Sequence, residues 1–457
     1  MIPRTKQTRF HRHDKTQAFA RGDEARALRI YIDSATTPDS DALQVLLDFA
    51  AHEQVEVVTT DGRSPIDLTI GAYDQHHHYT SVEINFPDGR RMHTGVPGPD
   101  IQGIGREFLP GDPDEGERQA VLAVIADEQG SDALVTESDL LLNALPRNIV
   151  EGANPMTPET AVALLGLFLR VREDFVFYVS QGGRMKFDRG LFYWVLMREL
   201  LPSAWRWFSA CVSSSTNTKD DTILLVAQSA LERTERALRA RDRMHERLQL
   251  TPNRDSVTEA IFYFDVTLLM LGGAFDGLAR VAHITHSLKG SPRSASWGSK
   301  EWLKKLGNAN KPLADAMQPE QPFRDARELV AALRNTIHSM SLRTVTHQAL
   351  GRRDELVLVP SDIAPDLEAV VNRLRTADEF GVTREADQRL YIRPGTYVEV
   401  ALPIVAEALN GVMDLTPVAQ LPGVDPAFLT TGPPTDRNDN VWAPDIRAQI
   451  WRLGGIG

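Results

Sequence analysis

The sequence predicts an α/β domain with a parallel or mixed sheet, followed by a mainly α-helical bundle with small β additions. Two observations support this fold class. Before residue 150, short β-branched and aromatic runs alternate with helical patterns, as in parallel or mixed sheets. From about residue 155 the strand signals fade, and long stretches with apolar residues at helical spacing replace them.

The composition is that of a globular protein. The 457 residues are 42% hydrophobic and 25% charged, so large cores can be buried. The formal net charge of −12 makes the whole chain a poor binder of nucleic acid, and any such contact needs a local basic patch. Cys211 is the one cysteine, which excludes an intramolecular disulfide and a thiolate metal cage and suits the reducing cytoplasm.

The predicted organisation has five parts. Residues 1–27 form a basic, flexible tail without the apolar core of a signal peptide, or alternatively an electrostatic arm for a polyanion. An α/β domain spans 28–150, and connecting helices follow over 151–215. A helical domain with a β insertion covers 216–415, and 416–457 form an irregular C-terminal tail.

The α/β domain is expected to contain three strand–helix steps and a hairpin. "LRIYI" is a strand that ends at Asp33, a helix follows over "DSDALQVLLDFAAHEQ", and "VEVVTT" is the next strand. Residues 76–95 form a hairpin with Pro-Asp-Gly at its turn. "ERQAVLAVIADEQG" is a helix stopped by Gly130, and "DALVTESDLLLNAL" is a strand, a turn and a helix.

The helical part is expected to contain two aromatic-rich helices split at Pro202, then a polar linker and three longer helices. The first two long helices follow "TILLVAQSALERTERALRARDRMHERLQL" and "SVTEAIFYFDVTLLMLGGAFDGLARVAHITHSL". The second is strongly apolar, but Asp265 interrupts an apolar run that is too short to cross a bilayer, so a buried helix and no membrane partner are expected. The third helix covers residues 323–347.

Arg334, Asn335 and His338 lie near the end of that third helix. At a spacing of three and four residues, these polar groups share one side of a helix. One reading is an RNA-cleaving site, because the ordinary pKa of histidine suits proton transfer and an arginine neutralises charge on a phosphate. The other reading is a cationic C-terminal cap, which favours the helix dipole.

Four carboxylates are candidate ligands for Mg²⁺ or Mn²⁺. Asp33 ends the first strand, and Asp132, Glu137 and Asp139 surround the later strand "ALVT". Sites in open α/β sheets form outside the carboxyl ends of the strands, and these ions prefer oxygen ligands. Two ions there would support phosphodiester hydrolysis. The alternative is that the four acids are helix caps and solvated turn residues.

The segment with these carboxylates resembles a PIN-like nuclease domain. The resemblance rests on "RIYIDSA" and on "QAVLAVIADEQGSDALVTESDLLL". In that family the first strand ends in a metal-binding Asp, which matches Asp33, and later acids follow a helix–strand–turn. The family's acid at the start of the preceding helix is replaced here by Gln119.

Residues from about 216 to 350 resemble a HEPN domain, found in prokaryotic toxin and phage-defence ribonucleases. The resemblance rests on "LERTERALRARDRMHERL", the apolar helix after it and "ELVAALRNTIHSMSL". It implies metal-independent RNA cleavage with Arg334, Asn335 and His338 in the family's Arg, polar and His roles. It also implies a homodimer, and a toxin role implies an antitoxin or other regulatory partner. The family usually has four to six residues between Arg and His, whereas this chain has three.

Other residues compete for these roles. Arg343 with His347, and Arg280 with His286, have similar spacings. The histidines His76 and His78 would share a strand face and could bind zinc, although no further ligand is apparent. A stripe of four arginines is predicted on one face of the first long helix, to bind RNA or to form surface ion pairs: Arg236, Arg239, Arg243 and Arg247.

Three functions follow from these readings. The first is a cytoplasmic ribonuclease that uses the Arg334 helix without a metal. The second is a non-catalytic RNA- or nucleotide-binding scaffold, favoured by the acidic net charge. The third is a metal-dependent nuclease that uses the N-terminal carboxylates.

Overall fold

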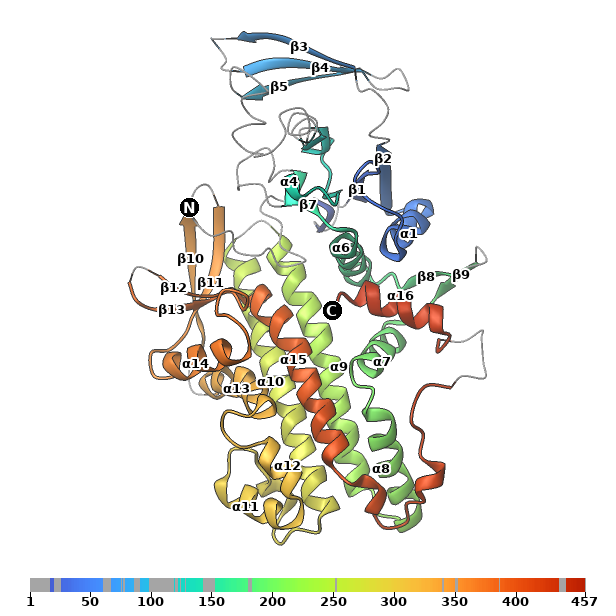
Figure 1. Ribbon diagram of the computed structural model, residues 1–457, viewed down its shortest axis with the longest axis vertical. Coiled ribbons are helices and arrows are strands. Elements are labelled where there is room, and N and C mark those ends of the chain that lie inside the picture. The colour runs from blue at the N-terminus through green and yellow to red at the C-terminus, as the bar shows by residue number, and fades with distance from the viewer. Residues whose placement is uncertain are drawn as a thin grey trace. The chain divides into compact units, whose positions relative to one another are not determined.

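The computed structural model divides the chain into two compact units (Figure 1), the first mainly of Arg9–Leu169 and the second mainly of Arg170–Leu248 and Pro252–Gly457. The boundary falls within the segment 151–215 that the sequence assigns to connecting helices. The structure describes residues 17–19, 26–60, 67–74, 76, 79–85, 91–97, 119, 122–123, 125–127, 129–142, 153–179, 183–250, 253–338, 341–349, 352–385, 387–434 and 441–456.

The first unit is built on a parallel sheet, as predicted. Its strand order is β2 (Val55–Thr60), β1 (Leu28–Asp33), β6 (Ala133–Val135) and β7 (Pro155–Met156). Every residue of β6 is buried, and so are all residues of β1 except Arg29. Central parallel strands are covered on both faces, which explains their nearly continuous apolar sequence.

Three helices of the first unit follow their predicted positions. Ser40 caps α1 (Asp41–Asp48) by accepting a hydrogen bond from the Leu43 backbone, and α4 (Asp139–Leu142) follows β6. Helix α6 (Pro158–Val171) begins with Pro158 at its first position. Gly130 ends the preceding helical segment with φ of +62°, which a glycine adopts without strain.

A separate antiparallel sheet lies between β2 and β6 in the sequence. It consists of β3 (Asp67–Asp74), β4 (Tyr79–Asn85) and β5 (Arg91–Pro97) in that order. The predicted hairpin is confirmed as β4 and β5, although its Pro-Asp-Gly turn lies outside the described residues. The sequence pattern for strand β3 is weaker, because Gly71 interrupts it. In the structure the pairing of β3 with β4 shifts register between Ile70 and Tyr73.

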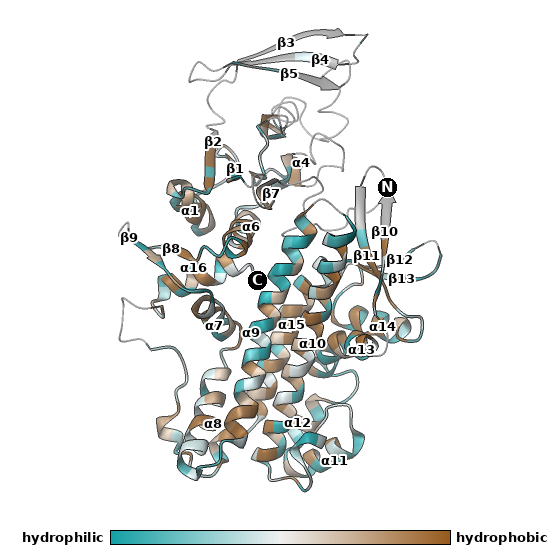
Figure 2. Cartoon of the chain, turned by 180° about the vertical axis from the view of Figure 1, so that it is seen from behind, coloured by the Kyte–Doolittle hydropathy of each residue, from teal (hydrophilic) through white to brown (hydrophobic). Residues whose placement is uncertain are grey.

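The second unit is mainly helical, as predicted, and its long helices match the apolar periodicity. In Figure 2, α9 carries mostly hydrophilic residues whereas α15 is mostly hydrophobic. The larger helices are α7 (Arg189–Leu200), α8 (Ala204–Thr218), α9 (Thr222–Gln249), α10 (Arg254–Thr285), α13 (Pro322–Ile337) and α15 (Pro394–Leu415). The smaller ones are α11 (Lys300–Ala309), α12 (Lys311–Ala316), α14 (Ala364–Leu374) and α16 (Pro444–Gly454). Helix α8 extends into the segment predicted as a polar linker.

Helix α10 packs against both α13 and α15. Its 32 residues have the length and apolar composition of a membrane span, but 61% of its apolar window is buried inside the protein. At Gly277 it approaches α9 so closely that a Cβ would stand 2.8 Å from Cβ of Ala230. The apolar run is therefore the core helix that the sequence suggests.

Two small sheets complete the second unit. One is the hairpin of β8 (Val176–Val179) and β9 (Gly183–Lys186), for which the sequence gives no clear signal. The other has the order β10 (Arg343–Ala349), β11 (Arg352–Leu358), β13 (Leu390–Ile392) and β12 (Val382–Arg384). The prediction of one helix over 323–347 was wrong at its end, because α13 stops at Ile337 and the β-branched run after Arg343 forms a strand.

The expectation of an irregular tail over 416–457 was wrong at its end, because Pro444–Gly454 form helix α16. Ile446, Ile450 and Leu453 are buried at helical spacing, and Gly455 ends the helix with φ of +63°. Arg447 donates two hydrogen bonds to Glu199 on α7, at 2.7 and 2.9 Å. The isoleucine spacing was a helical signal that the Pro- and Asp-rich surroundings concealed.

Candidate functional site

Helix α13 positions the predicted catalytic residues. Pro322 occupies its first turn, and Leu329, Val330 and Leu333 are buried on its inner side. The Tyr397 hydroxyl donates to the Leu329 carbonyl at 2.6 Å and fixes the helix against α15. The inner side of the helix is thus packed on the bundle, while polar residues of its last turn reach the surface.

Arg334 faces α10. Its Nη2 lies 2.8 Å from Oδ2 of Asp276, and both side chains are partly exposed, by 22% and 28%. The arginine stem passes over Gly272, where a Cβ would stand 2.6 Å from Cδ of Arg334. Asp276 is a partner that the sequence alone does not indicate, because it lies some 58 residues away in the chain on another helix.

Asn335 and His338 are exposed at the end of the same helix. His338 is the C-cap residue, and its backbone N–H donates to the Arg334 carbonyl at 3.4 Å. At about 100° per residue, His338 lies between the directions of Arg334 and Asn335 on the helix surface. The three groups thus occupy one helix end, but Arg334 packs on α10 whereas Asn335 lies at the edge of a groove beside α14.

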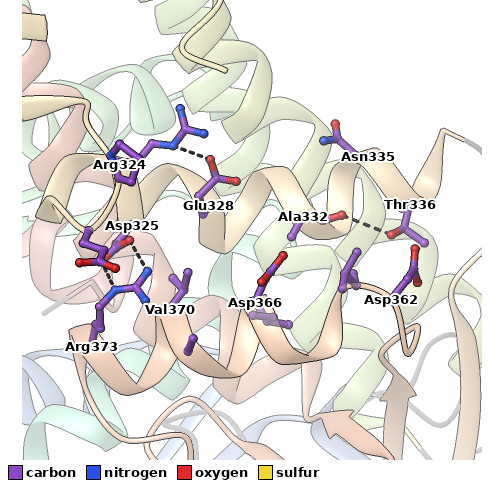
Figure 3. Close-up of a pocket in the computed structure, with 15 residues that line it drawn as sticks. Arg324, Asp325, Glu328, Ala332, Asn335, Thr336, Asp362, Asp366, Val370 and Arg373 are labelled. Carbon is purple, nitrogen blue, oxygen red and sulfur yellow. Dashed lines mark hydrogen bonds and ion pairs between the residues drawn. The ribbon is translucent and has the colours of Figure 1, made fainter. Parts of the chain in front are cut away.

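That groove lies between α13 and α14 and has a volume of about 580 Å³ (Figure 3). Two of its arginines are neutralised within it: Arg373 donates two hydrogen bonds to Asp325, and Arg324 pairs with Glu328 at 2.7 Å. Three further acids line the groove without an ion-pair partner in the described part of the chain: Glu320, Asp362 and Asp366. The surplus of negative charge makes this groove unsuitable for a phosphate group.

The two competing Arg–His pairs have different surroundings. Arg280 is exposed, whereas His286 accepts or shares a hydrogen bond with Asn310 Nδ2 at 3.2 Å, and burial lowers the pKa of His286. Arg343 and His347 lie on strand β10, not on a helix. Of the three Arg–His pairs, only Arg334 and His338 therefore lie on one helical turn at the surface.

The four arginines predicted as an RNA-binding stripe on α9 all have acidic partners. Arg236 pairs with Glu232 at 3.1 Å, and Arg243 pairs with Glu246 at 2.9 Å. The remaining pairs are Arg239 with Glu235 and Arg247 with Glu259. This arrangement fits the alternative reading of the stripe as a surface of ion pairs.

Two of the predicted metal ligands in the first unit are engaged within the protein. Asp33 is buried, accepts hydrogen bonds from the Ala35 backbone and the Thr36 hydroxyl, and stabilises the turn after β1. Asp132 is also buried and accepts two hydrogen bonds from Arg26, at 2.7 and 2.9 Å. Carboxylates with these functions have little remaining capacity to coordinate a cation.

The sheet also separates these ligands. Asp132 accepts a hydrogen bond from the Arg29 backbone, four residues before Asp33, so the two acids are about 13 Å apart along β1. The expectation that Asp132 joins Asp33 at one edge was therefore wrong, because Asp132 precedes its strand. Glu137 and Asp139 follow that strand and are exposed.

Metal ligation by the four acids together is thus not supported by their geometry. In the described part of the chain, no group of three or more His, Cys, Asp or Glu side chains could hold a metal ion. His76 lies in a turn, whereas His77 and His78 lie outside the described residues, so the zinc hypothesis gains no further ligand.

A buried ionic network that the sequence did not reveal lies in the second unit. Arg170 donates two hydrogen bonds to Asp242, at 2.6 and 2.8 Å, and one to the Leu453 carbonyl. The Tyr193 hydroxyl donates to Asp242 at 2.6 Å, and its burial, followed by the charge of Asp242, raises the pKa of this phenol. In the sequence, Asp242 looked like one more charge on a solvated helix.

The rest of this network also consists of a buried arginine that is bonded to a carboxylate and to carbonyl groups at the end of α16. Arg241 is 1% exposed and donates two hydrogen bonds to Glu399, at 2.5 and 2.8 Å. It also donates to the carbonyls of Gly454 and Gly455, and His245 shares a hydrogen bond with Glu399 at 2.8 Å. Arginines at the carbonyl end of α16 complement its dipole, so the network anchors the C-terminal helix.

Comparison of the chain with protein-family models, with curated proteins and with solved structures finds no match in any of the three. The resemblances to HEPN and PIN-like domains therefore rest on the residues quoted above, and the function must be inferred from the site itself.

Proposed function

We propose that the protein is a cytoplasmic, metal-independent ribonuclease whose chemistry takes place at the end of α13. The observation that carries the proposal is the surface position of one helical turn with an arginine, an amide and an imidazole. These are the residue types that RNA cleavage by the 2′-hydroxyl requires. The resemblance to HEPN domains supports the same assignment.

In the proposed reaction the RNA supplies its own nucleophile. The 2′-oxygen forms a bond to phosphorus as the bond to the 5′-oxygen breaks, which leaves a 2′,3′-cyclic phosphate and a 5′-hydroxyl. His338 takes the proton of the 2′-hydroxyl or protonates the leaving oxygen. Arg334 neutralises charge on the phosphate, and Asn335, three residues before His338, orients the imidazole. In a homodimer, a second copy of α13 supplies the other proton-transfer group.

Cleavage of an RNA pool in EDTA by wild type and His338→Ala tests this function. We expect the substitution to reduce the rate at least about 100-fold, as for loss of a general acid or base. His93→Ala removes an exposed histidine of the first unit and is the matched control. Equal cleavage by wild type and His338→Ala in EDTA would refute the proposal.

A non-catalytic RNA-binding module is the second candidate. The ion pair between Arg334 and Asp276 favours it, because it reduces the positive charge that Arg334 can supply to a transition state. RNA binding without cleavage in any buffer would support this candidate. The toxin-like assignment adds a regulatory partner, such as an antitoxin.

A metal-dependent nuclease at the carboxyl end of β1 is the third candidate. No contact favours it, because Asp33 stabilises the turn after β1 and no group of three or more metal-ligating side chains is found in the described part of the chain. This candidate gains support if cleavage requires Mg²⁺ or Mn²⁺ and does not change in His338→Ala.

A further inference from the structure

Two neighbouring glycines in the middle of α10 each lie beneath an arginine from another helix. Arg334 of α13 passes over Gly272, as described above. Arg233 of α9 passes over Gly273, where a Cβ would stand 2.9 Å from Cζ of Arg233 and would overlap Nη1. Because each glycine costs a helix about 1 kcal/mol relative to alanine, a Gly-Gly pair here needs a reason. The structural reason is the space that it leaves for two guanidinium groups.

Arg233 differs from the neighbouring arginines of α9 in its partners. Arg236, Arg239 and Arg243 each have an acidic partner, but no carboxylate pairs with Arg233 in the described part of the chain. Its side chain is half-buried, so this charge is held in place by packing on α10. A half-buried cation with a fixed position and no counter-ion is suited to receive an anion.

Arg334 also retains capacity for an anion. Asp276 binds its Nη2, whereas its Nε is buried and has no acceptor among the described residues. Arg233 and Arg334 thus bring two positive charges to one level of α10, against the single negative charge of Asp276. Consecutive Cα atoms are about 3.8 Å apart, so the two side chains cross α10 at adjacent residues.

We propose that Arg233 and Arg334 together bind one phosphate group of the RNA backbone, with Arg233 as a second phosphate-binding residue of the α13 site. This inference rests on the proposed function. The planar guanidinium groups match the oxygens of a phosphate. The acidic groove on the α14 side of α13 repels phosphate, so the RNA backbone approaches from the α10 side.

RNA binding in the His338→Ala background tests the site, because binding is then measured without cleavage. The probe is a fluorescent single-stranded RNA, and anisotropy gives Kd at several salt concentrations. We expect Arg233→Ala to raise Kd about tenfold and to make the salt slope shallower than the value of about −0.7 for one phosphate contact on a single strand. Arg233→Gln keeps most of the side-chain length and should have the same effect.

A second variant moves the charge without removing it. In Gly273→Ala the new methyl group occupies the place of the Arg233 guanidinium, so Kd should rise as in Arg233→Ala. Gly307→Ala on α11 is its control, since a Cβ there makes an ordinary 3.4 Å contact with Ala314. Circular dichroism confirms that each variant is folded.

Arg189→Ala is the control for net charge, because Arg189 is an exposed arginine on α7 that pairs with Glu173. An equal rise in Kd in Arg189→Ala and Arg233→Ala would overturn the site, as would unchanged binding in both Arg233 variants. If wild type still cleaves RNA in these cases, the proposed function stands and the phosphate site alone fails. Absence of RNA binding together with absence of cleavage by wild type would overturn both.

Discussion

Single residues of the helical unit differ in how their charges are compensated, and this decides which of them can bind a ligand. Arg241 and Arg170 are buried, and carboxylates and carbonyl groups satisfy them. Arg236 is exposed and paired. Arg233 and Arg334 lie between these extremes, partly buried and incompletely compensated. Availability of charge, not the number of arginines, identifies the candidate phosphate site.

Asp265 on α10 gives a prediction at this scale. Burial raises the pKa of its carboxyl from 3.8 to about 6. Between these pH values the folded state binds more protons than the unfolded state, so stability falls as pH rises from about 4 to about 6. Asp265→Asn should abolish this part of the pH dependence and stabilise the protein at pH 7. The gain is on the order of 1 kcal/mol, because solvent screens a half-exposed carboxylate.

Urea unfolding of wild type and Asp265→Asn at pH 4 and pH 7 measures this effect. The two proteins should differ more at pH 7 than at pH 4. A difference that is the same at both pH values would show that ionised Asp265 is not destabilising.

Glu399 gives a prediction of opposite sign. Burial alone would raise its pKa, but the charges of and hydrogen bonds from Arg241 and His245 outweigh burial and lower it to about 2. Its stabilising contribution is therefore present above pH 4.5 and is lost as pH falls toward 2. Glu399→Gln leaves buried Arg241 with the carboxylate of Asp242, which is 3.5 Å away and already paired with Arg170, and should lower the free energy of unfolding by about 3 kcal/mol.

Chemical denaturation at pH 7 checks the Glu399 prediction. Glu301→Gln removes an exposed partner of Lys305 on α11 and should leave the free energy of unfolding nearly unchanged. Equal effects of the two substitutions would show that the buried network does not anchor α16.

At the scale of helices and strands, the sequence predicts regular periodicity better than it predicts ends. Helices α9 and α10 and strands β1 and β2 follow their apolar patterns. The end of α13 was misjudged because helical and strand residues follow one another without a glycine or proline between them. Helix α16 was missed because its surroundings are rich in turn-forming residues.

The sequence predicts the residues of the candidate site, but it does not predict which side chains contact them. Spacing alone placed Arg334, Asn335 and His338 on one helical turn. The pairing of Arg334 with Asp276 and the position of Arg233 depend on contacts between helices far apart in the sequence. The misplacement of Asp132 has a related cause, because strand register determines which end of a strand an acid occupies.

Packing between α13 and α15 gives a prediction at this scale. A Cβ on Gly411 would overlap the ring of Phe323, which lies in the first turn of α13. Gly411→Ala should therefore lower the free energy of unfolding by about 1–3 kcal/mol, the usual cost of overpacking a core. Thermal unfolding should show a lower Tm, whereas Gly307→Ala should be neutral or stabilising. A Tm in Gly411→Ala at or above that of wild type would contradict the close approach of these helices.

At the scale of the whole molecule, the net charge of −12 opposes RNA binding. A site in which Arg233 and Arg334 together bind one phosphate predicts a slope of log K against log salt of about −0.7 for single-stranded RNA. Participation of the four paired α9 arginines as well, with one phosphate each, would give a slope of about −3.5. Anisotropy titrations of His338→Ala from low to physiological salt distinguish these values, and the steeper slope would show that the α9 stripe binds RNA.

In the proposed reaction, RNA is cleaved by its own 2′-hydroxyl at the end of α13. The most direct test is mass spectrometry of the RNA ends produced by wild type and His338→Ala in EDTA and in Mg²⁺. We predict 2′,3′-cyclic phosphate and 5′-hydroxyl ends from wild type in both buffers, and loss of these products in His338→Ala. Products with 3′-hydroxyl ends that form only in Mg²⁺ and persist in His338→Ala would contradict this mechanism.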